Sequence, residues 1–384
     1  MRHGDRGTET MFLTKVKFVL KFLTLFFIIL RQHSYGNVIT FEDSSLLQHA
    51  RMALRDSTTF FSNENCSTIE YFQVERENIY SLEGIECMKD LRILKIGHNN
   101  ILNAEPLKML NSLKVLDISH NPLKSLDPIS KLKNIEWLKI NGTDIVDANF
   151  ISKLLTLEYL SISHNAISEL TGLKTLVKLE ELDFSRNKIS FINHLQHMNS
   201  LRVLKFNRNN IQSMSGVENL ITLEKIEARN NRIDDITHIQ NLNNLRHLEL
   251  SNNSVKDIKP LKDLRKLEVL RLANNNISDL RGIESLTSLK ELRLDANRIV
   301  TISPLKHLHN LKVLDLGNNK IFDLSPLARL EKLEILRLSQ NKINDITPIL
   351  SLPNLIVLEL WENELNQDAI VSIEKLNERQ VHVD

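Results

Sequence analysis

The sequence of 384 residues has little of several residue types that mark particular protein classes. It holds only two cysteines, Cys66 and Cys87, which excludes a disulfide-rich scaffold and a cysteine-built zinc cluster. Aromatic residues make up 5% of the chain, so aliphatic side chains must fill the core and any exposed aromatic is informative. The formal net charge is +1 without a long run of one sign, which argues against a nucleic-acid partner.

The sequence also lacks the motifs of common enzymes. It contains no phosphate-binding Gly-x-x-x-x-Gly-Lys, no Gly-x-Gly-x-x-Gly, no Gly-x-Ser-x-Gly and no His-Glu-x-x-His. His98, His120 and His164 share one position of the repeat described below, but two neighbouring imidazoles fall short of the ligands that a metal site needs. We therefore expect no enzyme activity, no cofactor and no metal.

The N-terminal segment differs from the rest of the chain. Lys15 and Lys17 precede an apolar stretch from Phe18 to Leu30 that only Lys21 interrupts, and the small residues Ser34 and Gly36 follow. This order is typical of a secretory signal peptide, which we place at residues 1–36. The sequence therefore predicts a secreted or extracytoplasmic protein without membrane insertion after signal cleavage; the alternative is an uncleaved N-terminal segment that anchors the protein in a membrane.

One constant period organises almost all of the remaining chain. An apolar residue opens each segment, at Leu91, Leu113, Ile135, Leu157, Leu179, Leu201, Leu223, Leu245, Leu267, Leu289, Leu311, Leu333 and Leu355, and every step between these positions has the same length. Ile69 adds one degenerate copy at the beginning of this series. A fixed period in this range is the signature of stacked repeats, in which neighbouring units share one continuous core.

Residues 311–332 show the pattern of one unit. Leu314 and Leu316 alternate with outward-facing residues, as in a short strand, and apolar residues then recur in steps of three, as in a 3-10 turn. The ninth position is an amide in nearly every unit, and Thr143 is the exception. This column comprises Asn99, Asn121, Asn165, Asn187, Asn209, Asn231, Asn253, Asn275, Asn297, Asn319, Asn341 and Asn363. Because a buried amide can pair with backbone groups of the turn, we assign these asparagines a structural role.

These repeated residues resemble the leucine-rich-repeat family in its 22-residue form, which internalin-like bacterial proteins and regulators of protein phosphatase 1 share. The resemblance implies the α/β fold class and a right-handed solenoid, or horseshoe. It also implies a parallel concave β-sheet with 3-10 or short helices on the convex side.

The two ends of the repeat array carry different patterns. Residues 37–68 are expected to form an N-terminal helical cap, with Asp43 and two serines before a run of apolar residues at helical spacing. Residues 69–365 form the solenoid of about 14 repeats, and 366–384 form a C-terminal cap. In that cap we expect a helix with Ala369, Ile370, Ile373 and Leu376 on its apolar face, followed by a last strand.

Exposed aromatics on the concave side indicate where a partner binds. One outward-facing column of the strands reads Tyr71, Ile93, Val115, Trp137 and Tyr159, and forms an apolar stripe. Large aromatics anchor protein interfaces, so we assign this stripe to partner binding. Trp361, in the last full repeat, is a second candidate anchor. The next outward column is a ladder of mixed charge, which solvated cross-strand pairs explain.

Two functions fit these features. The first is an exported, non-enzymatic and monomeric protein that binds a protein ligand on its concave face. The second is an intracellular regulatory scaffold that resembles the phosphatase 1 regulators. The N-terminal segment discriminates between them, because only the first function requires export.

Cys66 and Cys87 are expected to form a disulfide. Their separation along the chain is one position shorter than the period, so they lie at nearly the same angle on neighbouring coils. Closing a loop of this size would stabilise the N-terminal end of the solenoid by about 3 kcal/mol. Thiol titration of the unfolded, unreduced protein should find no free thiol; two free thiols would contradict the disulfide.

Overall fold

The computed structural model describes residues 38–54 and 61–384. The signal peptide predicted at 1–36 lies outside the described residues. The chain divides into two compact units. Unit 1 contains the described residues up to Val115 together with Leu123–Leu132, and unit 2 contains Leu116–Pro122 and Lys133–Asp384.

Short strands recur with the period of the sequence. They follow one another in chain order, and every strand pair is parallel. Their bounds are β1 Tyr71–Gln73, β2 Ile93–Lys95, β3 Val115–Asp117, β4 Trp137–Lys139, β5 Tyr159–Ser161, β6 Glu181–Asp183, β7 Val203–Lys205, β8 Lys225–Glu227, β9 His247–Glu249, β10 Val269–Arg271, β11 Glu291–Arg293, β12 Val313–Asp315, β13 Ile335–Arg337, β14 Val357–Glu359 and β15 His382–Val383. In unit 2 each residue from β4 to β14 pairs with the equivalent residue of the next repeat.

A 3-10 helix follows most strands. Proline stands in the first turn of several of these helices, where its fixed φ suits a helix start. The helices are η1 Ile85–Cys87, η2 Glu105–Met109, η3 Asp127–Lys131, η4 Asn149–Lys153, η5 Thr171–Leu173, η6 Asn193–Leu195, η7 Thr237–Ile239, η8 Lys259–Leu261, η9 Ile283–Ser285, η10 Ser303–His307, η11 Ser325–Leu327 and η12 Thr347–Ile349. The predicted order of strand, turn and helical turn is confirmed.

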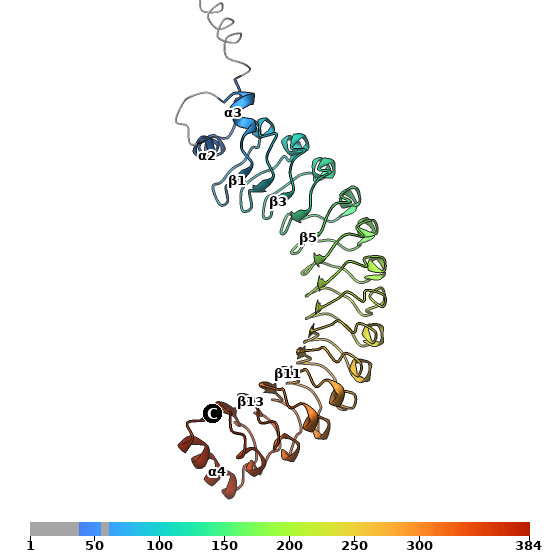
Figure 1. The fold of residues 1–384 in the computed structure, drawn as a ribbon, viewed down its shortest axis with the longest axis vertical. Coiled ribbons are helices and arrows are strands. Elements are labelled where there is room, and N and C mark those ends of the chain that lie inside the picture. Colours follow the sequence, from blue (N-terminus) through green and yellow to red (C-terminus); the bar gives the residue numbers. More distant parts are fainter. Residues whose placement is uncertain (1–37, 55–60) are drawn as a thin grey trace, which may run out of the picture. The chain divides into compact units, whose positions relative to one another are not determined.

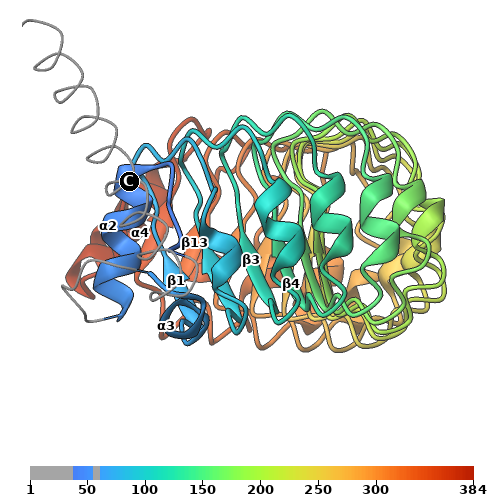
Figure 2. The same cartoon turned by 90° about the horizontal axis from the view of Figure 1, so that it is seen from above.

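Unit 2 is a solenoid of stacked repeats. Figure 1 shows its coils, coloured green to red, stacked along an arc with the strands on the inner side and the 3-10 helices on the outer side. Figure 2 shows the outer helices of these coils side by side. The concave sheet and convex helices expected from the sequence are therefore present in this unit.

The core lies between the strands and the helices. Leu314 and Leu316 are fully buried while Val313 and Asp315 are half-buried on the concave face, as the alternation of the sequence predicts. Where Phe184 and Phe206 replace leucine in neighbouring coils, their rings stack with centroids 5.7 Å apart and are also fully buried. The aliphatic core predicted from the low aromatic content thus takes up one aromatic pair.

The asparagine column connects each coil to the one before it. Asn275 is typical: its Nδ2 donates to the carbonyl oxygens of Leu250 and Leu272, each at 3.0 Å, and its Oδ1 accepts the amide of Val255 at 2.9 Å. The same bonds recur at Asn187, Asn209, Asn319 and Asn341. Through these bonds the amides satisfy backbone groups that the turn leaves unpaired.

The residue before each asparagine adopts a left-handed backbone. Its φ is +57° at His98, +56° at His164, +57° at Arg208 and +54° at Ala296. Side chains other than glycine rarely adopt this conformation, which costs roughly 1–2 kcal/mol per residue. The conformation recurs because the chain must bend sharply after each strand. This bend places the side-chain amide of the following asparagine inside the coil.

The N-terminal cap of unit 1 consists of two helices, α2 Ser44–Leu54 and α3 Asn63–Ser67. Asp43 caps α2, since its Oδ1 accepts the amides of Ser45 and Leu46 at 2.9 Å. Its Oδ2 accepts the amide of Tyr80 at 2.9 Å, which ties the cap to the first coil. Helix α3 carries Cys66, which is disulfide-bonded to Cys87 of η1 with their Cα atoms 5.5 Å apart.

The C-terminal cap is helix α4, Gln367–Glu378, followed by β15. Asn366 caps the helix by accepting the amide of Ala369 at 2.8 Å. Ala369 and Leu376 are buried as predicted, but the assignment of Ile370 to the apolar face is wrong, because this side chain is 48% exposed. Ser372 is buried instead, and its hydroxyl donates to the carbonyl of Asp368 at 2.8 Å.

Truncation of a core leucine tests the register of the repeat. Leu314→Ala should lower the free energy of unfolding by about 2–5 kcal/mol through lost burial and a cavity. Because each coil contacts only its neighbours, the loss should spread cooperatively along the solenoid. Leu155→Ala is the matched control, since Leu155 is 56% exposed and should change stability by less than about 0.5 kcal/mol. Urea unfolding compares the two variants, and equal midpoints would contradict the register.

Candidate functional site

The candidate site lies on the concave face of unit 2. In each strand the middle residue is buried, and the first and last residues turn to the concave surface. Because successive strands pair in register, the first residues form one column across the coils and the last residues form another. A side chain on this face can therefore contact side chains one full repeat away in the sequence as well as those of its own strand.

Trp137 and Tyr159 begin neighbouring strands and stack on each other. They are register partners, and their ring centroids lie 4.6 Å apart with an interplanar angle of 10°. Both side chains are half-buried. Burial, with a smaller contribution from the charge of Glu181, raises the pKa of the Tyr159 hydroxyl, so the phenol stays neutral. The stacked rings of Trp137 and Tyr159 thus form a flat apolar surface, the aromatic shelf, with the Tyr159 hydroxyl as a polar group at its edge.

Ion pairs border this shelf on both sides. The Lys139 ammonium lies 3.2 Å from the carboxylate of Asp117, and the Lys205 ammonium lies 2.5 Å from that of Glu181. These charges satisfy each other within the sheet face. They leave the two rings as an apolar centre within a polar frame.

The remaining stripe residues lie in unit 1. Tyr71 and Ile93 are register partners, Tyr71 is 51% exposed, and its hydroxyl donates to Oε1 of Gln73. Val115 is half-buried at the start of β3. The stripe predicted from the sequence thus consists of the exposed Tyr71 with the half-buried Ile93 and Val115 in unit 1, and the stacked pair in unit 2.

Trp361 does not belong to the aromatic pair. It follows β14, nine strands beyond β5, which corresponds to about 43 Å at the usual spacing of strands. Its side chain is 47% exposed, and its carbonyl oxygen accepts the amide of Gln340 at 2.9 Å. A second anchor at Trp361 would therefore contact a different part of any ligand.

The C-terminal half of the concave face carries paired charges. Nε of Arg271 lies 2.9 Å and Nε of Arg293 2.7 Å from the carboxylate of Glu291, and Nε of Arg337 lies 2.7 Å from that of Glu359. Arg271 and Arg337 of the mixed ladder therefore form cross-strand pairs, and Arg293 pairs with Glu291 of its own strand. These pairs explain the charges of the ladder without a ligand.

Asp315 is the exception among these charges. Burial and the neighbouring Asp295 raise its pKa to about 6. The Arg337 guanidinium lies 3.9 Å away but is engaged by Glu359, and the Gly317 amide donates to Oδ1 at 3.1 Å. Sequence alone gave no signal for this shift, because it requires knowing which carboxyls become buried side by side.

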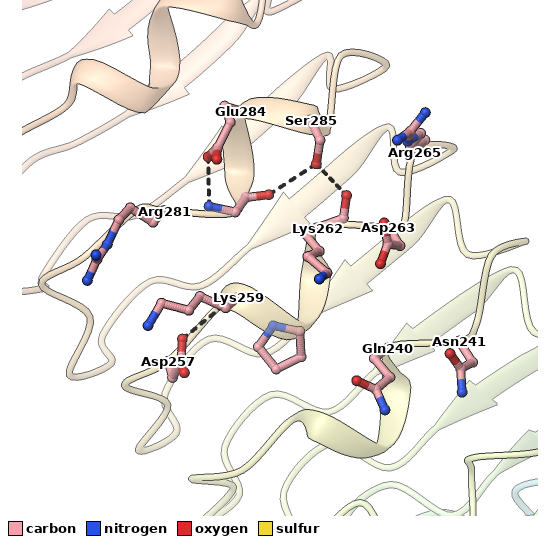
Figure 3. Close-up of a pocket in the computed structure, with 12 residues that line it drawn as sticks. Gln240, Asn241, Asp257, Lys259, Lys262, Asp263, Arg265, Arg281, Glu284 and Ser285 are labelled. Atoms are coloured by element: carbon pink, nitrogen blue, oxygen red, sulfur yellow. Dashed lines mark hydrogen bonds between the residues drawn. The ribbon is translucent and has the colours of Figure 1, made fainter.

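The convex side of unit 2 has a polar cavity of about 750 Å³ (Figure 3). Lys259, Lys262 and Arg281 line it, and Figure 3 shows that the Glu284 carboxylate turns back to the amide of Gly282 rather than into the cavity. Its walls are charged and open, whereas small-molecule sites are mostly apolar and enclosed. We therefore place the candidate site on the concave face.

Two further properties limit the chemistry of the described part of the chain. Within residues 38–54 and 61–384, no three histidine, cysteine, aspartate or glutamate side chains are grouped so that they could hold a metal ion. In the same residues no helix has both the length and the apolar character that crossing a membrane requires.

Two sequence profiles of one family match the chain. The profile described as Leucine Rich repeats (2 copies) matches residues 155–197, 243–286, 265–307 and 287–329, and the profile described as Leucine Rich Repeat matches 112–132. Comparison with the curated proteins gives no match.

Solved structures resemble the chain over most of its length. An internalin, InlF, from Listeria monocytogenes is 30% identical with a TM-score of 0.81, over 83% of this chain and 95% of that one. A leucine-rich-repeat protein from Leptospira interrogans is 24% identical with a TM-score of 0.72, over 84% and 97% of the two chains. The plant peptide hormone receptor RGFR1 in complex with RGF2 is 22% identical with a TM-score of 0.64, over 76% and 50%.

Replacing Asp315 should change how stability depends on pH. Its folded-state pKa of about 6 lies above the ordinary 3.8, so its favourable contribution is full below about pH 4 and is lost as the pH rises through 6. Asp315→Asn should therefore match the wild type near pH 4 and exceed its unfolding free energy at pH 7.5 by roughly 1 kcal/mol, allowing for solvent screening.

Urea unfolding at both pH values measures this difference. Asp183→Asn is the control, because Asp183 occupies the same strand position and its Oδ1 accepts the amide of Ser185 at 2.9 Å. A gain in stability that is the same at both pH values would contradict the assignment to Asp315.

Proposed function

Because the chain belongs to the leucine-rich-repeat family, we propose that it is an exported, non-enzymatic protein that binds a protein partner through its concave face. The observation that carries this proposal is the stacked pair Trp137–Tyr159. Two large aromatics half-exposed on a strand surface are not needed for the core, which the aliphatic residues already fill. Such residues are enriched among the anchors of protein interfaces.

The stack is also prepared for binding. Its two rings hold each other in a fixed orientation, so a ligand that lands on them restricts little further side-chain motion. The flanking pairs Lys139–Asp117 and Lys205–Glu181 provide polar groups at the rim. A partner would therefore gain apolar contact at the centre and hydrogen bonds at the edge.

Export is supported by two independent features. The apolar stretch of residues 18–30 after Lys15 and Lys17 has the character of a signal peptide. The disulfide between Cys66 and Cys87 suits an oxidising compartment, since such bonds are rare in the cytosol. Both features favour the exported protein over the intracellular scaffold.

The relatives support the architecture of this proposal more than its details. The plant receptor was solved in complex with RGF2, but at 22% identity its likeness to this chain shows a shared fold alone. The binding surface of this chain is therefore argued from its own residues.

Removal of both rings tests the proposed site. A partner would be identified by pull-down with the purified protein, and its affinity measured by calorimetry. Trp137→Ala with Tyr159→Ala should weaken binding by about 2 kcal/mol or more per anchor, because each ring would lie at the desolvated centre of the interface. Circular dichroism should be unchanged, since neither ring belongs to the core.

A second double variant is the control for this test. Phe191→Ala with Phe322→Ala also removes two exposed aromatics, 73% and 54% exposed, but outside the strands. It should leave the affinity unchanged. Equal affinities of the wild type and the Trp137 and Tyr159 double variant would place the binding site elsewhere on the protein.

A further inference from the structure

Charged residues directly before the strands of unit 2 form a third column, next to the first residues of the strands. Side chains from neighbouring coils reach one another there and pair with opposite charge. The ion-pair distances are 2.9 Å for Arg202–Glu224, 2.8 Å for Arg246–Glu268, 2.6 Å for Lys290–Glu268 and 2.7 Å for Lys312–Glu334. As a rule, the charged residues of this column from Arg202 to Glu334 therefore have a partner of opposite charge on a neighbouring coil.

Glu158 and Glu180 break the rule. They occupy this column on consecutive coils, both are exposed, and among residues 61–384 neither forms an ion pair. The next cation in the column, Arg202, directs both Nε and Nη2 to Glu224 on its other side. Two like charges one strand spacing apart, about 4.8 Å, disfavour the folded chain slightly.

The two glutamates adjoin the aromatic shelf. Glu158 immediately precedes Tyr159, which stacks on Trp137. Glu180 immediately precedes Glu181, the register partner of Tyr159. The unpaired carboxylates and the exposed rings therefore occupy the same part of the concave face.

We propose that Glu158 and Glu180 receive a lysine or arginine side chain of a polypeptide partner whose neighbouring apolar residue contacts Trp137 and Tyr159. This inference rests on the proposed function and names the chemistry of its ligand. A cation between the carboxylates would give them the partner of opposite charge that the residues from Arg202 to Glu334 have. A guanidinium can bridge two carboxylates through its separate N–H groups.

The same charges argue against other occupants. Within the part of the chain that the structure describes, the two carboxylates have no cation paired with them. They would therefore repel the phosphate groups of nucleic acids or anionic lipids. A bound metal ion needs more ligands than this pair offers, and the described residues contain no group of three acidic, imidazole or thiol side chains that could hold one. A basic polypeptide can pair its cation with the carboxylates and place an apolar residue on the rings.

Selection from a random heptapeptide library displayed on phage tests the proposal without a known partner. Peptides recovered by the purified wild-type protein should be enriched in lysine or arginine next to an aromatic or aliphatic residue. Synthetic copies of those peptides should bind the Glu158→Lys, Glu180→Lys variant at least about tenfold more weakly, because the complementary charge is reversed. Their affinity for the wild type should fall as salt is raised.

The matched control is Glu169→Lys with Glu331→Lys. It changes the net charge by the same amount at exposed positions outside the column and should leave peptide affinity unchanged. Recovered peptides that need Trp137 and Tyr159 but show neither basic enrichment nor sensitivity to the Glu158 and Glu180 reversal would overturn this inference and leave the proposed function intact. Recovered peptides that bind the Trp137 and Tyr159 double alanine variant as well as the wild type would overturn both.

Discussion

The hydrogen bonds of the asparagine column are the constraint on which the rest of the solenoid depends. Each amide donates to a carbonyl of its own turn and to one of the preceding coil, and accepts an amide of that coil, as Asn275 does. A coil can therefore neither slide nor rotate against its neighbour without leaving buried backbone groups unpaired. This fixed step aligns the strands residue by residue and makes the surface columns continuous.

Because the columns are aligned, residues at the same position in consecutive repeats become neighbours on the surface. Trp137 and Tyr159 stack because they hold the same position in consecutive repeats, and Lys139 pairs with Asp117 for the same reason. The same rule places Glu158 beside Glu180, where it brings like charges together. Favourable and unfavourable pairs on the concave face thus arise from one geometric rule, and the unfavourable ones are informative because the core does not require them.

This rule also explains how much the sequence could predict. The period located the strands, the buried Leu314 and the asparagine column, and the spacing of the two cysteines brought Cys66 close to Cys87. Prediction failed where the period ends, as at Ile370, because the capping helix is oriented by the last coil alone. The pKa of Asp315 was also out of reach, since it reflects burial beside Asp295, whose side chain comes from another column.

The left-handed residue before each asparagine recurs from coil to coil, and this affects how the chain can gain or lose whole repeats. The same φ near +57° is adopted by histidine, arginine, asparagine and alanine at this position, so the conformation belongs to the stack and not to any one side chain. At this turn, every internal coil therefore presents the same backbone conformation to its neighbours. A segment one repeat long could be duplicated or lost whole during evolution without a new junction, lengthening or shortening the concave face while the capping helices at its ends stay unchanged.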